Sequence, residues 1–380
     1  MTLPVRRCET LETPVFIIFR YLGRQVLTTM AAVALVLLLI FMSGRFLQYL
    51  AAAAEGEYAA NVIFIVMGYR LPEFLELILP LSFFLAILLT YGRMYQESEM
   101  TVLTACGVSE RQVLLLTLGP GVLIAVAVGA MSLWLTPAGI QQVDRIFAEQ
   151  AQRTGFEMLA PGRFQEMGSD DRVTYTRAMS DDKQTLEGVF MAEGRDDGRF
   201  TLMKAEKGTQ IVEEEDGERF LVLNEGVRFE GRPGGSEFDA MTFEDYGLRI
   251  EPPSGVSSGD SREGQPTTEL MASEAPADQA MVHWRLSLPL LVLVITVLGI
   301  PLSRVNPRQG RFFHLLPGIL VFISYLGLLI LGRDAIASGQ LPVRAGLWGV
   351  HLAYLVLGAA MLAWPALRLR RAAGVQHAAD

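Results

Sequence analysis

The stretch VLTTMAAVALVLLLIFMSG at residues 26–44 contains no charged side chain, and it decides which class of protein this chain belongs to. A helix needs ~20 apolar residues to cross the ~30 Å hydrocarbon core of a bilayer, so this stretch is long enough to span a membrane. It is too long for the core of a signal peptide, and no A-x-A-like cleavage site follows it. We therefore interpret it as a span that the mature protein keeps.

The rest of the chain contains five more apolar runs without a charge. They are Leu77–Gly92, Val113–Val143, Leu286–Ser303, Phe312–Gly332 and Ala345–Leu367. Inside lipid, only a helix or a closed barrel satisfies its own backbone, and runs this continuous are not the alternating strands of a barrel. The predicted fold class is therefore a membrane α-helical protein with six transmembrane helices in two groups of three.

Between the two groups of helices, the chain becomes polar and follows a strand pattern. Short segments rich in Val, Phe, Thr and Leu alternate with Gly, Asp and Asn turns, which is typical of a β-sandwich or a partly open barrel. A stretch rich in Ser, Gly, Pro and acidic residues follows, and it predicts a flexible linker. We thus expect four parts: an N-terminal transmembrane half at 1–136, an all-β domain at 137–251, a linker at 252–282, and a C-terminal transmembrane half with its tail at 283–380.

The distribution of arginines sets the predicted orientation. Twelve arginines lie in the segments 1–25, 93–112, 304–311 and 368–380, whereas the short segments on the opposite side carry Arg45, Arg70, Arg333 and Arg344. By the positive-inside rule, both termini lie in the cytoplasm and the β domain lies on the other side of the membrane. Arg304 and its neighbours are explained equally well by this anchoring and by contact with anionic lipid or a cytoplasmic partner.

Charge and residue usage exclude several function classes. Residues 137–282 carry 30 acidic and 15 basic side chains, so this region lacks the basic footprint of a nucleic-acid-binding protein. The lysines of the chain are Lys183, Lys204 and Lys207, and none stands in the G-x-x-x-x-G-K-[ST] loop of a P-loop ATPase. No metal-ligand spacing and no G-x-S-x-G motif occurs. We predict neither an enzyme nor a bound cofactor, and we place any ATP hydrolysis in a separate subunit.

The first cytoplasmic loop, RMYQESEMTVLTACGVSERQ at 93–112, predicts a short helix of its own. Ser98 stands at its N-cap with Glu99 in the first turn, Gly107 ends it, and Ser109-x-x-Gln112 is a capping box for the next span. With Met100, Val102 and Leu103 available, this helix suits a groove on a partner. The alternative is a simple turn between two spans with solvated charges.

Five segments of the chain, this loop among them, match a known family. They are FRYL at 19–22, LILPLS at 77–82, QESEMTVLTACGVS at 96–109, NEGVRFEG at 224–231 and PLSRVNPRQGR at 301–311. They resemble the lipopolysaccharide export system permease family, whose paralogous subunits are LptF and LptG, and they are more similar to the LptF branch. The resemblance covers nearly the whole chain.

The resemblance implies an exporter in the inner membrane of a Gram-negative bacterium. Its fold has six spans and a periplasmic β-jellyroll. Its partners are the paralogous permease subunit, a dimeric cytoplasmic ATPase, a periplasmic jellyroll protein with a membrane anchor, and lipopolysaccharide itself. The implied function is to extract lipopolysaccharide from the outer leaflet of the inner membrane and to pass it to a periplasmic bridge toward the outer membrane.

The resemblance also implies roles for individual residues. Glu99 matches a carboxylate that engages the ATPase, and the helix at 98–107 matches the coupling helix. The implied contact set is Glu97, Ser98, Glu99, Met100, Leu103, Cys106 and Gly107, with Glu97 on the solvated side. Arg45 matches a basic residue that contacts the phosphorylated headgroup of the lipid, although a basic residue also commonly flanks a span. A second basic position of the family is Gln48 here.

Three ionisable residues, Arg70, Glu73 and Glu76, lie at the start of the second span. Ionisable groups at membrane depth are costly, which favours a functional role. The alternative is an Arg70–Glu73 pair or snorkelling toward the interface.

Two other functions remain open from the sequence. One is a permease of the same architecture for another lipid or a lipoprotein. The other is a non-transporting membrane scaffold for periplasmic partners, in which the loop helix would be dispensable.

Overall fold

The computed structural model describes residues 12–55, 62–157, 161–166, 172–180, 185–194, 199–212, 219–232, 234, 238–249, 262–305, 315–343 and 346–376. The chain forms two compact units. One consists of Met1–Ser43, Tyr69–Ile140 and Arg262–Asp380, and the other of Gly44–Gly68 and Gln141–Ser261. Most of the apolar helices belong to the first unit, and the β-strands belong to the second.

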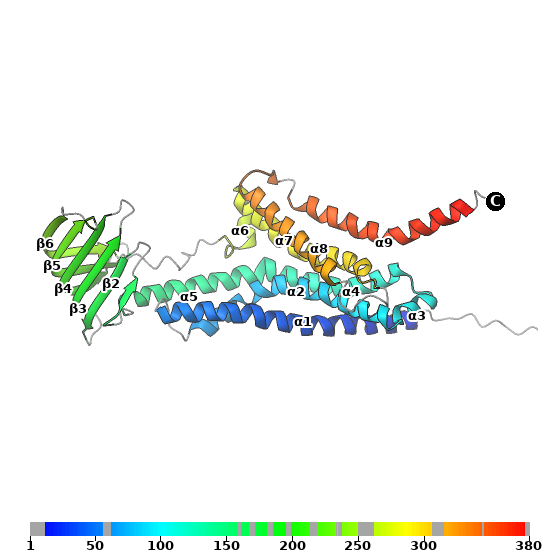
Figure 1. Ribbon diagram of the computed structural model, residues 1–380, viewed down its shortest axis with the longest axis horizontal. Helices are drawn as coiled ribbons and strands as arrows, with labels where there is room; N and C mark the ends of the chain where they lie inside the picture. The colour runs from blue at the N-terminus through cyan, green and yellow to red at the C-terminus, as the bar shows by residue number, and fades with distance from the viewer. Residues whose placement is uncertain are drawn as a thin grey trace, which may run out of the picture. The chain divides into compact units, whose positions relative to one another are not determined.

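The helices of the chain are seen in Figure 1. They are α1 (Glu12–Glu55), α2 (Ile63–Gln96), α3 (Glu99–Ala105), α4 (Glu110–Ala130), the π-helical turn η2 (Met131–Leu135), α5 (Thr136–Glu157), α6 (Thr267–Ala272), α7 (Pro276–Leu302), α8 (Leu315–Ala337) and α9 (Trp348–Gln376).

Five helical segments among the described residues are long and apolar enough to cross a membrane. They are Phe16–Ala54, Ile63–Gln96, Glu110–Ala148, Pro276–Leu302 and Leu315–Ala337. At the place of the sixth predicted span, α9 has a shorter apolar stretch, Trp348–Trp364. The membrane helical class is confirmed, and five of the six predicted spans meet the length required.

The helix of the third span continues past Thr136, the residue at which the predicted N-terminal transmembrane half ends. Helix α4 passes through η2 directly into α5, which ends at Glu157. In η2 the backbone N–H of Thr136 donates to the carbonyl of Met131, five residues earlier rather than four. The π-turn therefore inserts one residue into an otherwise regular helix.

The core of the first unit forms around α2 and α7. Phe83 and Phe84 of α2 are fully buried, and Phe84 stacks on Phe322 of α8 with ring centroids 5.9 Å apart. Small residues let helices approach: a Cβ on Gly121 of α4 would lie 3.0 Å from Thr296 Oγ1 of α7. Helices α1 and α8, in contrast, expose most of their apolar side chains. In a membrane protein such surfaces face lipid or another subunit.

The second unit contains one antiparallel sheet. Its strands are β1 (Phe164–Glu166), β2 (Arg172–Met179), β3 (Thr185–Gly194), β4 (Phe200–Val212), β5 (Arg219–Gly231) and β6 (Phe238–Arg249), paired in chain order. One face buries Leu186, the alternate residues Val189 and Met191, and the alternate residues Leu221 and Leu223. The region expected to be all-β at 137–251 begins with α5, which ends at Glu157, and a β domain after that helix is confirmed. A jellyroll is not, because every described strand pairs only with its neighbours along the chain.

The structure differs from the predicted linker at 252–282. Residues 252–261 lie outside the described residues, but residues 262–275 form turns and α6, and α7 already begins at Pro276. Composition misses this order because the carbonyls of residues 262, 263 and 265 bind a buried arginine, Arg285, that lies beyond the segment. The family segment at 306–311 lies outside the described residues.

Candidate functional site

The loop after α2 folds as a short helix, α3, whose C-terminal end is closed by backbone hydrogen bonds. After α3, the N–H of Gly107 donates to Thr104 O (3.0 Å) and the N–H of Val108 donates to Leu103 O (3.0 Å). Gly107 has a φ of 92°, a conformation that glycine adopts without strain. These two bonds form a Schellman motif, in which a hydrophobic contact between the Leu103 and Val108 positions is usual. The predicted helix and its glycine end are confirmed.

The start of α3 differs from the prediction in one respect. Ser98 precedes the helix as expected, but its φ is 64° and its side chain makes no capping hydrogen bond. The helix after it is capped as predicted. Gln112 N–H donates to Ser109 Oγ (3.4 Å), and Ser109 N–H donates to Gln112 Oε1 (2.7 Å), which is the capping box of α4. The loop is therefore fixed at the α3–α4 junction by hydrogen bonds between side chains and backbone.

Helix α3 has an inner and an outer face. Met100 is 4% exposed and belongs to the core, and Leu103 packs against that core. Val102, on the other side, is 60% exposed, and Thr101, Ala105 and Cys106 are also exposed. The prediction that Met100 is available to a partner is wrong, because this chain's own core buries it, whereas Leu103 is half-buried. The outer face, with Val102 at its centre, is the surface that a partner can reach.

Glu99 and Glu97 have different surroundings. Tyr21 of α1 donates its hydroxyl to Glu99 Oε2 (2.9 Å), and Glu99 is half-buried. Glu97 is exposed, with Arg93 Nε 3.9 Å from its Oε2, so the predicted solvated position of Glu97 is confirmed. The sequence did not assign a role to Tyr21, although it lies in the FRYL segment at 19–22. Tyr21, on the neighbouring helix α1, thus orients the Glu99 carboxylate.

An ion pair closes the base of the loop. Arg304, just after α7, pairs with Glu110 in the first turn of α4. Sequence reasoning treated Arg304 as a topology anchor or a contact for lipid or a partner, and it missed Glu110. This pair joins the two transmembrane halves next to α3.

Removing the Arg304–Glu110 pair is expected to destabilise the protein slightly. Both side chains are partly exposed, so the pair contributes at most about 1 kcal/mol. We expect Arg304→Gln and Glu110→Gln each to lower the thermal midpoint of the detergent-solubilised protein, and the double variant to fall by less than the sum of the two. Glu97→Gln, at a solvated pair, is the control. Strict additivity in the double variant would show that the pair contributes nothing.

At the other end of α2, the three candidate residues Arg70, Glu73 and Glu76 have different partners. Arg70 Nη1 lies 3.1 Å from Glu73 Oε2, which confirms the predicted pair. Glu76 is 7% exposed and accepts a hydrogen bond from Thr136 Oγ1 (2.8 Å) at the first residue of α5. Arg70 and Glu73 are thus a local pair, whereas Glu76 joins α2 to the π-turn.

The candidate headgroup residue lies within a helix rather than at its end. Arg45 is exposed and donates from Nη1 to Gln48 Oε1 (3.1 Å), and α1 continues to Glu55. The 39 apolar-rich residues Phe16–Ala54 make a helix longer than the ~30 Å hydrocarbon core. Helix α1 is therefore longer than the hydrocarbon core is thick, and Arg45 lies in the second half of this helix.

Comparison with known proteins gives a consistent result. The family model of the lipopolysaccharide export system permease LptF/LptG matches residues 20–364. The chain is 31% identical over 357 residues to the permease protein LptF of Escherichia coli K12, which covers 93% of this chain and 97% of that protein. It is equally similar to LptF of Shigella flexneri. Similarity to LptG of E. coli K12 is 27% over 144 residues, 37% of this chain and 39% of that protein.

Proposed function

This chain belongs to the family of lipopolysaccharide export system permeases LptF/LptG, and we propose on that premise that it forms one half of a two-subunit lipopolysaccharide channel. It is a transport subunit for lipopolysaccharide in the inner membrane. The second half is a paralogue of the LptG type, and the pair draws lipopolysaccharide from the outer leaflet and passes it to a periplasmic bridge. The comparisons favour neither of the two alternative functions.

We propose six spans, with α9 as the sixth, and both termini in the cytoplasm. The arginine distribution supports this orientation, which puts the sheet in the periplasm. There the sheet passes lipid to a membrane-anchored jellyroll protein by pairing at a strand edge, a mode in which backbone hydrogen bonds give affinity. The spare edges of β1 and β6 are the strands available for such pairing among those described.

Energy for export enters through α3. In this proposal the exposed face around Val102 sits in a groove of the dimeric ATPase, and Glu99 meets a cationic side chain there. A charge-assisted hydrogen bond at such an interface is shorter and stronger than a neutral one. The observation that carries the proposal is the construction of the loop: an inner face packed on the core, a Schellman end and a capping box leave the outer face rigid for a partner.

Purification of the tagged chain from its native membrane tests this function. The expected result is that an ATPase, the paralogous permease and lipopolysaccharide copurify in detergent. Recovery of the chain with another lipid and the same ATPase would favour a permease for a different substrate. Recovery without any ATPase would contradict the exporter.

Substitution at Arg45 is expected to weaken the contact with the lipid headgroup. A basic side chain near an anionic surface contributes about 1 kcal/mol, so Arg45→Ala should lower copurified lipopolysaccharide roughly fivefold. Gln48→Arg, which places a second cation one turn away, should raise it. Equal lipid content in wild type and both variants would show that Arg45 only flanks the span.

A further inference from the structure

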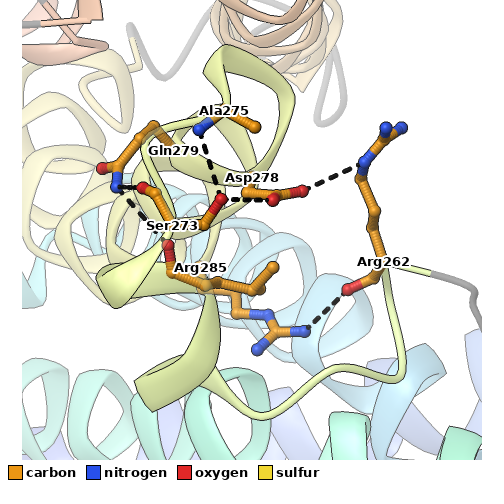
Figure 2. Close-up of polar contacts among 7 residues, drawn as sticks. Arg262, Ser273, Ala275, Asp278, Gln279 and Arg285 are labelled. Carbon is orange, nitrogen blue, oxygen red and sulfur yellow. Dashed lines mark hydrogen bonds and ion pairs between the residues drawn. The ribbon is translucent and has the colours of Figure 1, made fainter.

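A buried arginine holds the segment before α7 in place. Arg285 is 3% exposed, and its guanidinium donates to Glu263 O (2.8 Å), Gln265 O (3.0 Å) and Thr267 Oγ1 (2.7 Å), with Arg262 O at 3.4 Å. Figure 2 shows this guanidinium below the turn that joins α6 to α7. Burial of an unpaired cation is costly unless its donors are satisfied, and here backbone carbonyls and one hydroxyl satisfy them.

The turn between α6 and α7 is closed by contacts of Ser273 and of nearby side chains. Ser273 Oγ donates to Asp278 Oδ2 (2.6 Å), Arg262 Nε lies 3.1 Å from Asp278 Oδ1, and Gln279 Nε2 donates to Ser273 O (2.5 Å). All three contacts are drawn in Figure 2. They are local to the turn, so they fix α6 on α7 and reach no other helix.

Helix α6 contacts the first transmembrane half through its first residue, Thr267. Thr267 accepts from Arg285 and donates its hydroxyl to the carbonyl of Leu133 (2.8 Å), which lies inside η2. On another side of the π-turn, Thr136 donates to the buried carboxyl group of Glu76. The π-turn η2 is therefore hydrogen-bonded to Thr267 of α6, and Thr136, which follows it, is hydrogen-bonded to Glu76 of α2. Because Thr267 also accepts from Arg285, η2 is linked to α7.

Helices α4 and α7 are also joined at the ends that lie near α3. Glu110 begins α4 and pairs with Arg304, which follows α7. Between the two ends, Gly121 and Gly129 of α4 lie against Thr296 and Pro289 of α7, with the Cβ positions 3.0 Å and 3.5 Å from their nearest atoms. Helices α4 and α7 are thus packed along their length and fixed at both ends.

We propose that α4 and α7 act as one rigid lever that carries motion from α3 to the far end of the bundle, and that Arg285 and Thr267 are the positioning residues that hold this far end. Helix α3 leads directly into α4, so motion of α3 reaches the lever first. This proposal rests on the proposed function, in which an ATPase moves α3. Arginine suits the role because its planar fork supplies several donors in fixed directions, which lysine does not.

The test uses the reconstituted exporter, with the paralogous subunit and the ATPase, in proteoliposomes containing lipopolysaccharide. Thr267→Val keeps the shape of the side chain and removes the hydroxyl. We expect the lipopolysaccharide released per ATP hydrolysed to fall roughly fivefold, with the ATPase rate and the copurified ATPase unchanged. Thr267→Ser should keep the wild-type ratio of released lipopolysaccharide to hydrolysed ATP. Arg285→Lys should lower this ratio as Thr267→Val does. Asp278→Asn, in the same turn but without contact to η2, is the control.

Two results would overturn the lever. One is an unchanged ratio of lipopolysaccharide to ATP in Thr267→Val; the other is a parallel loss of ATPase rate, release and thermal stability, as a purely structural role predicts. Hydrogen exchange of residues 131–136 in the detergent-solubilised complex needs no substrate: the lever predicts protection in the wild type, with and without ATP, and faster exchange in Arg285→Lys. Absence of lipopolysaccharide release in the wild type would instead contradict the proposed function, and the exchange measurement would still decide whether Arg285 holds the far end of α4 and α7.

Discussion

Reversing the charge at Glu99 is expected to uncouple the permease from its ATPase. Glu99 is oriented by Tyr21 at 2.9 Å beside the exposed face of α3, where the proposed partner binds. Loss of one member of a desolvated interfacial charge pair costs at least about 2 kcal/mol, and reversal adds repulsion, so Glu99→Arg should reduce copurified ATPase by roughly 30-fold or more. Lipopolysaccharide export should fail with it.

Two variants separate the interface from the fold. Glu99→Gln keeps an oxygen that accepts from Tyr21 but removes the charge, and Tyr21→Phe removes the orienting donor while keeping the carboxylate. We expect Glu99→Gln to lose more ATPase than Tyr21→Phe does. A Glu99→Arg protein that binds and stimulates the ATPase as the wild type does would show that α3 is not the coupling helix.

Any side chain at Gly139 is expected to disturb the packing of α5 on α2. A Cβ built on Gly139 would lie 2.2 Å from the backbone carbonyl oxygen of Tyr69, and backbone cannot move aside as a flexible side chain does. Overpacking a core costs about 1–3 kcal/mol or more, so Gly139→Ala should lower the thermal midpoint by roughly 5 °C. Gly139→Leu should abolish recovery of folded protein.

The matched control is a helical glycine in open space. Gly68 of α2 has no atom within 4 Å of an added Cβ, and alanine favours a helix over glycine by about 1 kcal/mol. Gly68→Ala should therefore leave the midpoint unchanged or raise it. Equal midpoints for Gly139→Ala and wild type, measured by fluorescence-detected size exclusion, would contradict the close approach of α5 to α2.

Hydropathy and strand pattern were sufficient for the fold class, because both are averaged over many residues. The apolar run at residues 26–44 lies within α1, and the run that begins at residue 286 follows α7 to its end at Leu302. The linker prediction at 252–282 was wrong over residues 262–282, since order there comes from one distant residue, Arg285, binding backbone carbonyls. Composition carries no information about such a contact.

The candidate site was predictable where its contacts are local. The Ser109–Gln112 capping box and the Gly107 helix end follow from neighbouring residues, and both are confirmed. Tyr21 lies 78 positions from Glu99, and Arg304 lies 194 positions from Glu110. The inward orientation of Met100 likewise depends on helices that fold around it. These features needed the tertiary structure.

The most direct test of the exporter is ATP-dependent release of lipopolysaccharide from proteoliposomes that contain this chain, its paralogue and the ATPase. A periplasmic jellyroll acceptor carrying a photocrosslinker detects the released lipid. The account predicts crosslinked lipopolysaccharide only with ATP and only when this chain is present. Crosslinking of equal extent without this chain, or none with the complete complex and ATP, would contradict it.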